Sequence, residues 1–251
     1  MTEFSYQLYS SRNFGPLEQT LRMVADLGYA QVEGYGGLYS DAAAVETLKA
    51  GLAETGLTMP TAHFGLDQVE NDAQGAVDVA QALGIEAVLV PHIGPEDRAS
   101  DASGWAEFGK RLARAGQPFW DAGLTFGWHN HDFEFAALSD GVMPLELILG
   151  ADDRLALELD VAWVVVGGQN PNDWISGYKN RLIAAHIKDI APKGEATDED
   201  GWADVGHGTM DWPGLMGALR ATNCRYFVME HDNPSDDARF ASRSIASATS
   251  F

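Results

Sequence analysis

The sequence predicts an α/β protein of the (β/α)8 barrel class, folded as a single domain over residues 1–251. Eight short apolar runs of strand type alternate with longer stretches of helical periodicity, and this is the repeat count that such a barrel needs within about 250 residues. The runs keep an even spacing to the end of the chain. The alternative is an open doubly wound sheet. However, the first run is followed by SSRNFGP and not by the glycine-rich phosphate loop that often marks that fold.

The strand candidates are short runs rich in aliphatic, β-branched and aromatic residues. They cover residues 4–9, 29–34, 57–64, 86–93, 124–130, 155–160, 182–189 and 226–231. The helix candidates follow them in turn and cover residues 16–27, 41–55, 67–83, 101–122, 142–149, 171–179, 211–222 and 235–248.

Boundary signals support several of these helices. Pro16 stands at a plausible first position of the first helix, and Gly28 lies just past its end. Gly84 closes the third helix in the same way. Asp211 is placed to cap the seventh, with Pro213 in its first turn.

No linker or low-complexity tract divides the chain. The longest irregular stretch is 190–210, which is rich in Gly and Asp. A loop of this length inside a compact domain is usually functional or mobile.

Composition excludes several classes of function. The chain carries 16 basic and 37 acidic residues, a net charge of −21, which would repel nucleic acid and anionic lipid. No apolar run reaches membrane-spanning length and no secretory signal is visible, so we expect no membrane partner. The single cysteine, Cys224, fits a reducing cytoplasm and is expected to be a buried apolar residue.

Polar side chains gather where the predicted strands end, which is where barrels of this class carry their active sites. These residues are Glu33, His63, His92, His129, His131, Glu134, Asp160, His186, Lys188, Asp189, Glu230 and His231. They include six of the seven histidines, and the seventh, His207, lies in the 190–210 stretch. Any one of them is easily explained as a structural residue, but chance does not readily place nearly every histidine at one rim.

Carboxylates and imidazoles that converge in this way suit a divalent cation. Mixed oxygen and nitrogen ligands fit Mn²⁺, Mg²⁺, Co²⁺ or Zn²⁺. With no thiolate available in this set, a soft-metal site is not expected.

Several short motifs together resemble one known family. They are HNHDFEF at 129–135, ELDVAW around Asp160, HIKD from His186, GHGTMDW at 206–212 and MEHD around Glu230. This set resembles the xylose isomerase-like TIM-barrel superfamily, and within it the sugar phosphate isomerase/epimerase group. That group also holds ketose 3-epimerases, hydroxypyruvate isomerase, inosose dehydratase and endonuclease IV. The resemblance covers nearly the whole chain.

The resemblance implies that the last four strands supply the ligands of one divalent ion, foremost Mn²⁺, namely Glu134, Asp160, His186 and Glu230. Strand five leaves a choice open. Epimerases of the family carry their glutamate near the position of His129, whereas Glu134 lies five residues further on. Either Glu134 reaches back to the metal and leaves His129 or His131 free as a base, or a histidine is the ligand and Glu134 contacts substrate. We take Glu134 as the ligand.

The function implied is isomerisation or epimerisation of a keto or aldo sugar, by proton abstraction next to a carbonyl through a metal-stabilised enediolate. Glu230 would be the acid/base on one side of the sugar, and Glu134 or His129 the group on the other. Substrate contacts are expected from His63, His92, His131, Trp163 and Lys188. Lys188 has the alternative of pairing with Asp189.

Two other functions remain open on the same scaffold. One is a metal-dependent lyase or dehydratase of a keto-sugar, an inosose or a 3-keto-glycoside. The other is a sugar-binding barrel without catalysis. In either case the partner is a small sugar, and a homo-oligomer is possible.

DNA repair of the endonuclease IV type is disfavoured. The family member needs a histidine three residues after the aspartate, where this chain has Trp163, and an Asp-x-His pair before the glycine turn, which GWADVGHG lacks.

Overall fold

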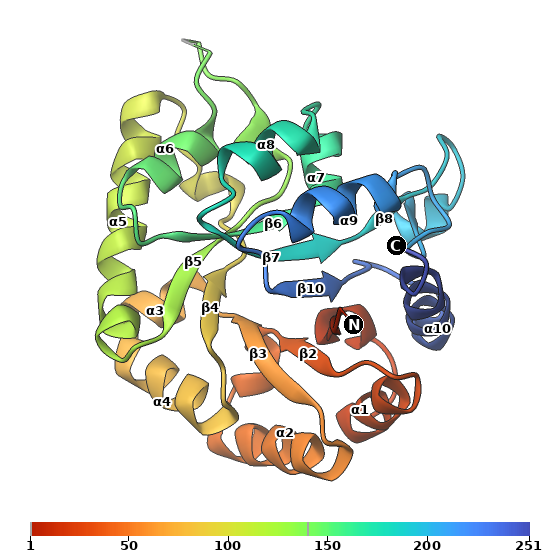
Figure 1. The fold of residues 1–251 in the computed structure, drawn as a ribbon. Helices are drawn as coiled ribbons and strands as arrows, with labels where there is room; N and C mark the ends of the chain where they lie inside the picture. Colours follow the sequence, from red (N-terminus) through yellow and green to blue (C-terminus); the bar gives the residue numbers. More distant parts are fainter. Residues whose placement is uncertain (1, 140) are drawn as a thin grey trace.

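Eight parallel strands close into a barrel, in the order β1-β10-β7-β6-β5-β4-β3-β2 (Figure 1). The computed structural model describes residues 2–139 and 141–251. The barrel strands are β1 (Phe4–Gln7), β2 (Gln31–Gly34), β3 (Thr58–His63), β4 (Ala87–Val90), β5 (Thr125–His129), β6 (Ala156–Asp160), β7 (Leu182–Ile187) and β10 (Tyr226–Met229). Each lies within a run that the sequence predicted as strand, and the predicted (β/α)8 barrel is confirmed.

Helices ring the barrel on its outside, as Figure 1 shows. They are α1 (Leu17–Asp26), α2 (Ala42–Thr55), α3 (Leu66–Asn71), α4 (Ala73–Leu83), α5 (Ala102–Asp121), α6 (Pro144–Gly150), α7 (Val161–Val166), α8 (Pro171–Gly177), α9 (Trp212–Arg220) and α10 (Asp237–Ala248). None of those described is both long and apolar enough to cross a bilayer.

Two helices differ from the sequence prediction. The helix expected over 67–83 is interrupted at Asp72, whose carboxylate accepts the backbone N–H of Gly75 at 3.1 Å and so begins a second helix. The short helix α7 was not predicted, because four of the six residues in its sequence VAWVVV are β-branched valines and the stretch shows no helical periodicity. It begins directly at the end of β6 and therefore stands beside the strand end that carries Asp160.

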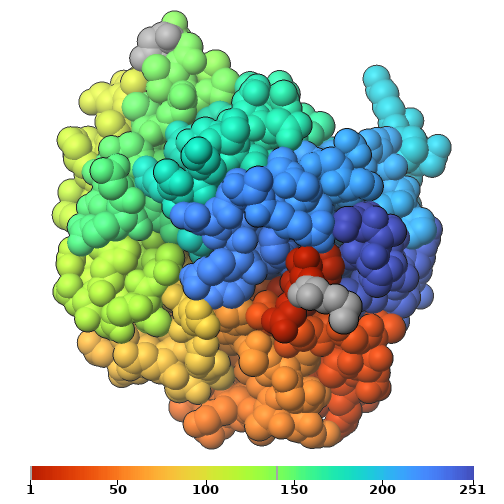
Figure 2. Space-filling model, in the orientation of Figure 1, coloured from red at the N-terminus to blue at the C-terminus, as the bar shows by residue number. Residues whose placement is uncertain are grey.

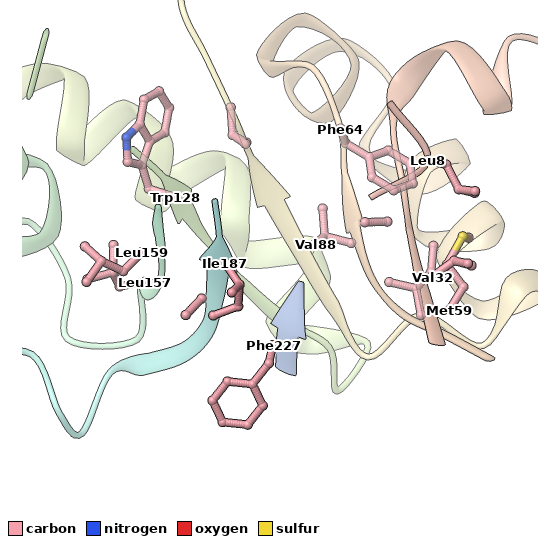
Figure 3. Packing of buried hydrophobic residues seen from close by; sticks show 14 of the residues in the cluster. Leu8, Val32, Met59, Phe64, Val88, Trp128, Leu157, Leu159, Ile187 and Phe227 are labelled. Carbon is pink, nitrogen blue, oxygen red and sulfur yellow. The ribbon is translucent and has the colours of Figure 1, made fainter. Parts of the chain in front are cut away.

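Side chains along each strand alternate between the surrounding helices and the barrel interior. Figure 3 shows five members of the outer apolar cluster on the strands, namely Val32, Leu157, Leu159, Ile187 and Phe227. Their polar neighbours on the same strands must point inward, and all of these are buried: Glu33, Glu158, Asp160 and His186. The alternation that builds the apolar core thus also fills the barrel interior with titratable groups.

The irregular stretch 190–210 is ordered around a small hairpin of β8 (Asp189–Ile190) and β9 (Trp202–Ala203). The segment between these strands contains the 3-10 turn η5 (Thr197–Glu199), and Figure 2 shows this cyan part of the chain projecting from the molecular surface. The buried carboxylate of Asp189 fixes its base, because it accepts backbone N–H groups from Gly206, Gly208 and Met210 at 2.9–3.2 Å.

Candidate metal centre and active site

Four side chains meet at the carboxyl ends of neighbouring strands. They are His129, Asp160, His186 and Glu230, and one ligand atom from each lies within 4.8 Å of the others. Strand register brings them together, since Asp160 pairs with His186 across β6 and β7, while His186 pairs with Val228 two residues before Glu230. All four are buried. We call these residues the rim cluster.

Glu134 does not belong to the rim cluster. It lies in a 3-10 turn (Phe133–Phe135) beyond β5, fully buried, and both carboxylate oxygens have partners there. The Trp128 indole N–H donates to Oε1 at 2.8 Å, and the His131 backbone N–H donates to Oε2 at 2.9 Å. The structure therefore brings His129, rather than Glu134, to the other three donors from strand five. Of the two alternatives drawn from the sequence, this geometry favours the histidine.

Asp160 combines a structural contact with a free donor atom. Its Oδ1 accepts the Trp163 backbone N–H at 2.9 Å and caps α7. Its buried Oδ2 makes no hydrogen bond within the described part of the chain, and the nearest ionic partner is Lys188 Nζ at 3.7 Å. Burial raises the pKa of Asp160 to about 6. An unpartnered buried oxygen is costly unless something binds it, so the donor set fits a cation at this position.

A second layer of charge lies deeper in the barrel, and it comprises Glu33, His63 and Glu158. His63 Nε2 lies 2.6 Å from Glu158 Oε2 and 3.2 Å from Glu33 Oε1. Burial and the nearby charge of Glu33 raise the pKa of Glu158 to about 7. Burial alone would raise the pKa of Glu33 too, but His63 and His186 lower it to about 2. The carboxyl groups of Glu33 and Glu158 thus differ in pKa although both lie beside His63.

His186 belongs to the rim cluster and also contacts this inner layer. Its Nδ1 lies 2.9 Å from Glu230 Oε2, and its Nε2 lies 2.7 Å from Glu33 Oε1. Burial lowers the pKa of His186, but Glu158, Glu230 and Glu33 together raise it well above the usual value. A metal-binding histidine commonly donates its other ring N–H to a carboxylate, which fixes the ring orientation. Glu33 is placed to do this for His186.

Lys188 is completely buried beside the rim cluster. Its Nζ donates to Asp232 Oδ2 at 2.5 Å and lies 3.3 Å from Glu230 Oε2. Asp189 is not its partner, because that carboxylate is occupied by backbone N–H groups of the following loop. Lys188 also stands 4.4 Å from the ring centre of Trp202 and 5.1 Å from that of Trp163. The positive charge of its ammonium group offsets the negative charge of the carboxylates around the site.

A cavity of about 540 Å³ opens over the rim cluster. Four of its lining residues were predicted as site residues and are histidines, namely His63, His92, His129 and His131. Glu230 also faces it. Of the remaining predicted contacts, Trp163 lines a neighbouring cavity, whereas Lys188 is completely buried and lines neither of the two. Catalytic residues of barrel enzymes come from several strand ends around such a mouth.

The sequence missed two acidic members of this site. Glu158 stands two positions before Asp160 on the same strand, so alternation along β6 would have placed it on the same inner face. Asp232 is the last residue of the MEHD motif, but the motif drew attention only to Glu230, and only the tertiary structure brings Asp232 to Lys188.

A barrel with a buried His/Asp/Glu cluster at the carboxyl ends of its strands is the architecture of a metal-capable (β/α)8 protein. Comparison with known sequences assigns the chain to a family within this fold class. The chain belongs to the xylose isomerase-like TIM barrel family, whose model matches residues 21–248. The family resemblance drawn from the motifs is confirmed. No curated protein matches the chain significantly in sequence.

Solved structures with the same fold are distant in sequence. A sugar phosphate isomerase/epimerase from Parabacteroides distasonis has a TM-score of 0.81 and 21% identity, over 98% of this chain and 92% of that one. The 3-keto-D-glucoside 4-epimerase of E. coli has a TM-score of 0.74 and 19% identity, over 100% of both chains. The IOLI protein, solved with a zinc atom, has a TM-score of 0.74 and 15% identity, over 99% of this chain and 97% of that one. At these identities the likeness shows the fold alone.

Proposed function

We propose that this protein is a divalent-metal-dependent isomerase or epimerase that moves a proton next to the carbonyl of a keto or aldo sugar. The observation that carries the proposal is the convergence of His129, Asp160, His186 and Glu230 under an open cavity. Membership of the xylose isomerase-like family supports it, as does the fold shared with two sugar epimerases.

In the proposed site, His129, Asp160, His186 and Glu230 hold the metal ion. We expect Mn²⁺ first, and Mg²⁺, Co²⁺ or Zn²⁺ as alternatives; a zinc atom in the structurally similar IOLI protein supports the presence of a metal without fixing its identity. Such an ion polarises a carbonyl and makes the neighbouring C–H more acidic. In this assignment Glu134 is not a ligand. Its carboxylate instead accepts N–H groups of Trp128 and His131.

Glu230 is the proposed proton acceptor on one side of the sugar. Burial would raise the pKa of Glu230, but Lys188 and His186 lower it well below the usual range. The group is therefore a carboxylate at neutral pH, and it faces the cavity where the sugar would lie.

His131 is the proposed partner on the other side. Burial lowers the pKa of His131 to about 3, so its imidazole is neutral. Its Nδ1 makes no hydrogen bond among the described residues, and the side chain lines the same cavity as Glu230. Because His129 is assigned here as a metal ligand, we propose His131 in its place as the second acid/base, acting with Glu230. His63 and His92 remain proposed contacts for sugar hydroxyls.

The substrate is proposed to be a small sugar and not nucleic acid or membrane, given the net charge of −21. A cytoplasmic location rests only on the single cysteine, and a homo-oligomer remains a prediction.

The test is exchange of a substrate C–H for deuterium from solvent. Metal-loaded protein would be incubated in D₂O with a panel of ketoses, inososes and 3-keto-glucosides and followed by NMR. We expect exchange at a carbon next to the carbonyl, with formation of an epimer or isomer. The variant Glu230→Gln should slow exchange at least about 100-fold, because a general base typically contributes 10²–10⁴-fold.

Other outcomes separate the remaining functions. Loss of water or of an aglycone without an epimer would replace the proposal by a lyase. Binding without exchange or product would leave a sugar-binding barrel. Full exchange in Glu230→Gln would remove Glu230 from the mechanism.

A further inference from the structure

We infer that the site is built for a glycoside, with a separate outer subsite that binds the ring attached to the reacting sugar. This inference rests on the proposed function and narrows its substrate class. The outer subsite would bind a glycosidically linked ring that has an apolar face. Either a second sugar or an aromatic aglycone has such a ring.

The outer subsite is a cavity of about 710 Å³ that adjoins the mouth over the rim cluster. The two cavities share two lining residues, Asp200 and Asp232. Small-molecule pockets measure roughly 300–1,000 Å³, and each of the two cavities alone falls within that range. The reacting sugar needs only the inner cavity, so the adjoining outer cavity leaves room for a ring attached to it.

The two cavities differ in chemistry, as a substrate with unlike ends would require. The inner cavity is lined by four histidines and Glu230. Among the described residues, no histidine lines the outer cavity; its apolar wall includes Trp163, Val166, Ile190, Pro192 and Trp202, and Lys193, Glu195 and Thr209 also line it. Trp163 and Trp202 stand edge to face, with ring centres 4.8 Å apart and planes at 74°. Trp202 is buried and supports Trp163, whose partly exposed indole can cover the apolar face of a ring, while Asp200 and Asp232 offer acceptors for hydroxyl groups between the subsites.

Exposed apolar side chains point to the same place. Within the described residues, three large hydrophobic side chains are exposed: Tyr9 at 37%, Val165 at 37% and Val166 at 47%. Tyr9 lines the inner cavity and Val166 the outer one. Two of the three therefore border the two cavities, where a ligand that spans both would cover them.

The outer wall is held in place before any ligand arrives. It includes the segment between β8 and β9, in which Ala196 and Asp200 adopt left-handed backbone angles of φ 46° and 59°. Such angles are costly for non-glycine residues and persist only where surrounding contacts enforce them. Those contacts come from Glu199, which accepts the Ser235 backbone N–H at 2.7 Å and pairs with Arg239 at 2.9 Å. A pre-formed wall favours binding because little ordering is needed.

The experiment compares two neighbouring valines at the end of α7. Val166→Trp places a large ring in the outer cavity, whereas Val165→Trp makes the same change at an exposed position that does not line it. Calorimetric titration of metal-loaded protein would use methyl 3-keto-glucoside, 4-nitrophenyl 3-keto-glucoside and 3-keto-cellobiose. Deuterium exchange into each compound would be measured in parallel.

We expect the two larger glycosides to bind at least about tenfold tighter than the methyl glycoside. Val165→Trp should keep that preference and Val166→Trp should lose it. A preference for the nitrophenyl compound alone would mark an aromatic aglycone, and one for 3-keto-cellobiose a second sugar. Equal binding of all three compounds, absence of binding, or equal loss in both variants would overturn the subsite.

Failure of the proposed function has a different signature. A binding preference that disappears in Val166→Trp, without deuterium exchange into any compound, would leave the subsite standing and remove the isomerase. Deuterium exchange into every compound without any binding preference would support the proposed isomerase and overturn the subsite.

Discussion

Asp160 uses its two carboxylate oxygens for different tasks. Oδ1 accepts the Trp163 N–H and begins α7, while Oδ2 has no hydrogen-bond partner in the described structure and faces the rim cluster. At the level of the sequence, a structural role and a metal-binding role are alternative explanations of such a residue. The structure shows that the cap occupies one oxygen and leaves the other, so both can hold.

Substitutions at Asp160 should separate these tasks. In Asp160→Asn the remaining oxygen can still accept the Trp163 N–H, so we expect near-native stability of the metal-free protein and metal affinity at least about 10-fold lower. Asp160→Ala should lose metal affinity and also about 1 kcal/mol of stability, because α7 loses its cap. Calorimetric metal titration and urea unfolding measure the two effects. Equal metal affinity in wild type and Asp160→Asn would contradict the ligand assignment.

Glu134 illustrates how burial and hydrogen bonding oppose each other at one residue. Two N–H donors favour the carboxylate, yet burial raises the pKa of Glu134 to about 8, against an ordinary value of 4.5. The folded protein therefore holds this proton more tightly than the unfolded chain does. The resulting stability is complete below the unfolded pKa and is lost as pH rises through the folded one.

This predicts a pH-dependent difference between wild type and Glu134→Gln. The variant cannot titrate at this position, so the free energy of unfolding of wild type minus that of the variant should fall steadily between about pH 5 and pH 8. Urea unfolding at several pH values in this window measures it. If the difference grows with pH, the two N–H donors outweigh burial and Glu134 is ionised.

At the scale of elements, strand alternation explains both what the sequence predicted and what it missed. Apolar residues of β6 face the helices, so Glu158 and Asp160 both face the interior, although the motif ELD drew attention only to Asp160. Short elements were missed for a different reason. The six residues of α7 and the two-residue strands β8 and β9 are too short for periodicity to show, and they form because of their neighbours.

The contact of α5 with α6 gives an element-scale prediction. Gly109 in α5 lies so close to α6 that an added Cβ would stand 2.8 Å from the Ile148 carbonyl oxygen and 2.9 Å from the Ala151 Cβ. We expect Gly109→Ala to destabilise the protein by about 1–3 kcal/mol, despite the better helix propensity of alanine. Gly150→Ala is the matched control, since nothing lies within 4 Å of its added Cβ. Thermal unfolding that ranks the two variants alike would mean that the helices separate easily.

At the scale of the whole molecule, the rim cluster joins distant parts of the chain. Its four members lie between residues 129 and 230 and come from the ends of four strands, so a bound ion would connect half of the barrel. Without a cation, Lys188 and protonated histidine are the groups among the described residues that offset the buried carboxylates of the site. Metal binding should therefore stabilise the folded state as a whole.

Metal dependence of unfolding tests this point. Protein treated with a chelator should unfold at lower temperature than protein with Mn²⁺ or Zn²⁺, and the stabilisation should reach about 2.7 kcal/mol when free metal exceeds its dissociation constant 100-fold. Binding should also release protons, since the pKa of His186 is raised in the metal-free site and a metal ligand must be deprotonated. Asp160→Asn is the control and should show a much smaller shift. An unfolding temperature that is indifferent to metal would contradict the rim cluster as a metal centre.

The sequence by itself indicated the barrel, because eight evenly spaced apolar runs with helical stretches between them, and no glycine-rich phosphate loop after the first run, favour a closed parallel sheet over an open one. It also determined that polar groups would collect at one rim, because parallel strands end together. Tertiary structure decided which of these groups meet. His129 rather than Glu134 joins the rim cluster, and Asp232 rather than Asp189 pairs with Lys188, because the path of each loop after its strand sets where the side chains after that strand point. Loop paths depend on contacts with distant residues, and no local pattern in the sequence records them.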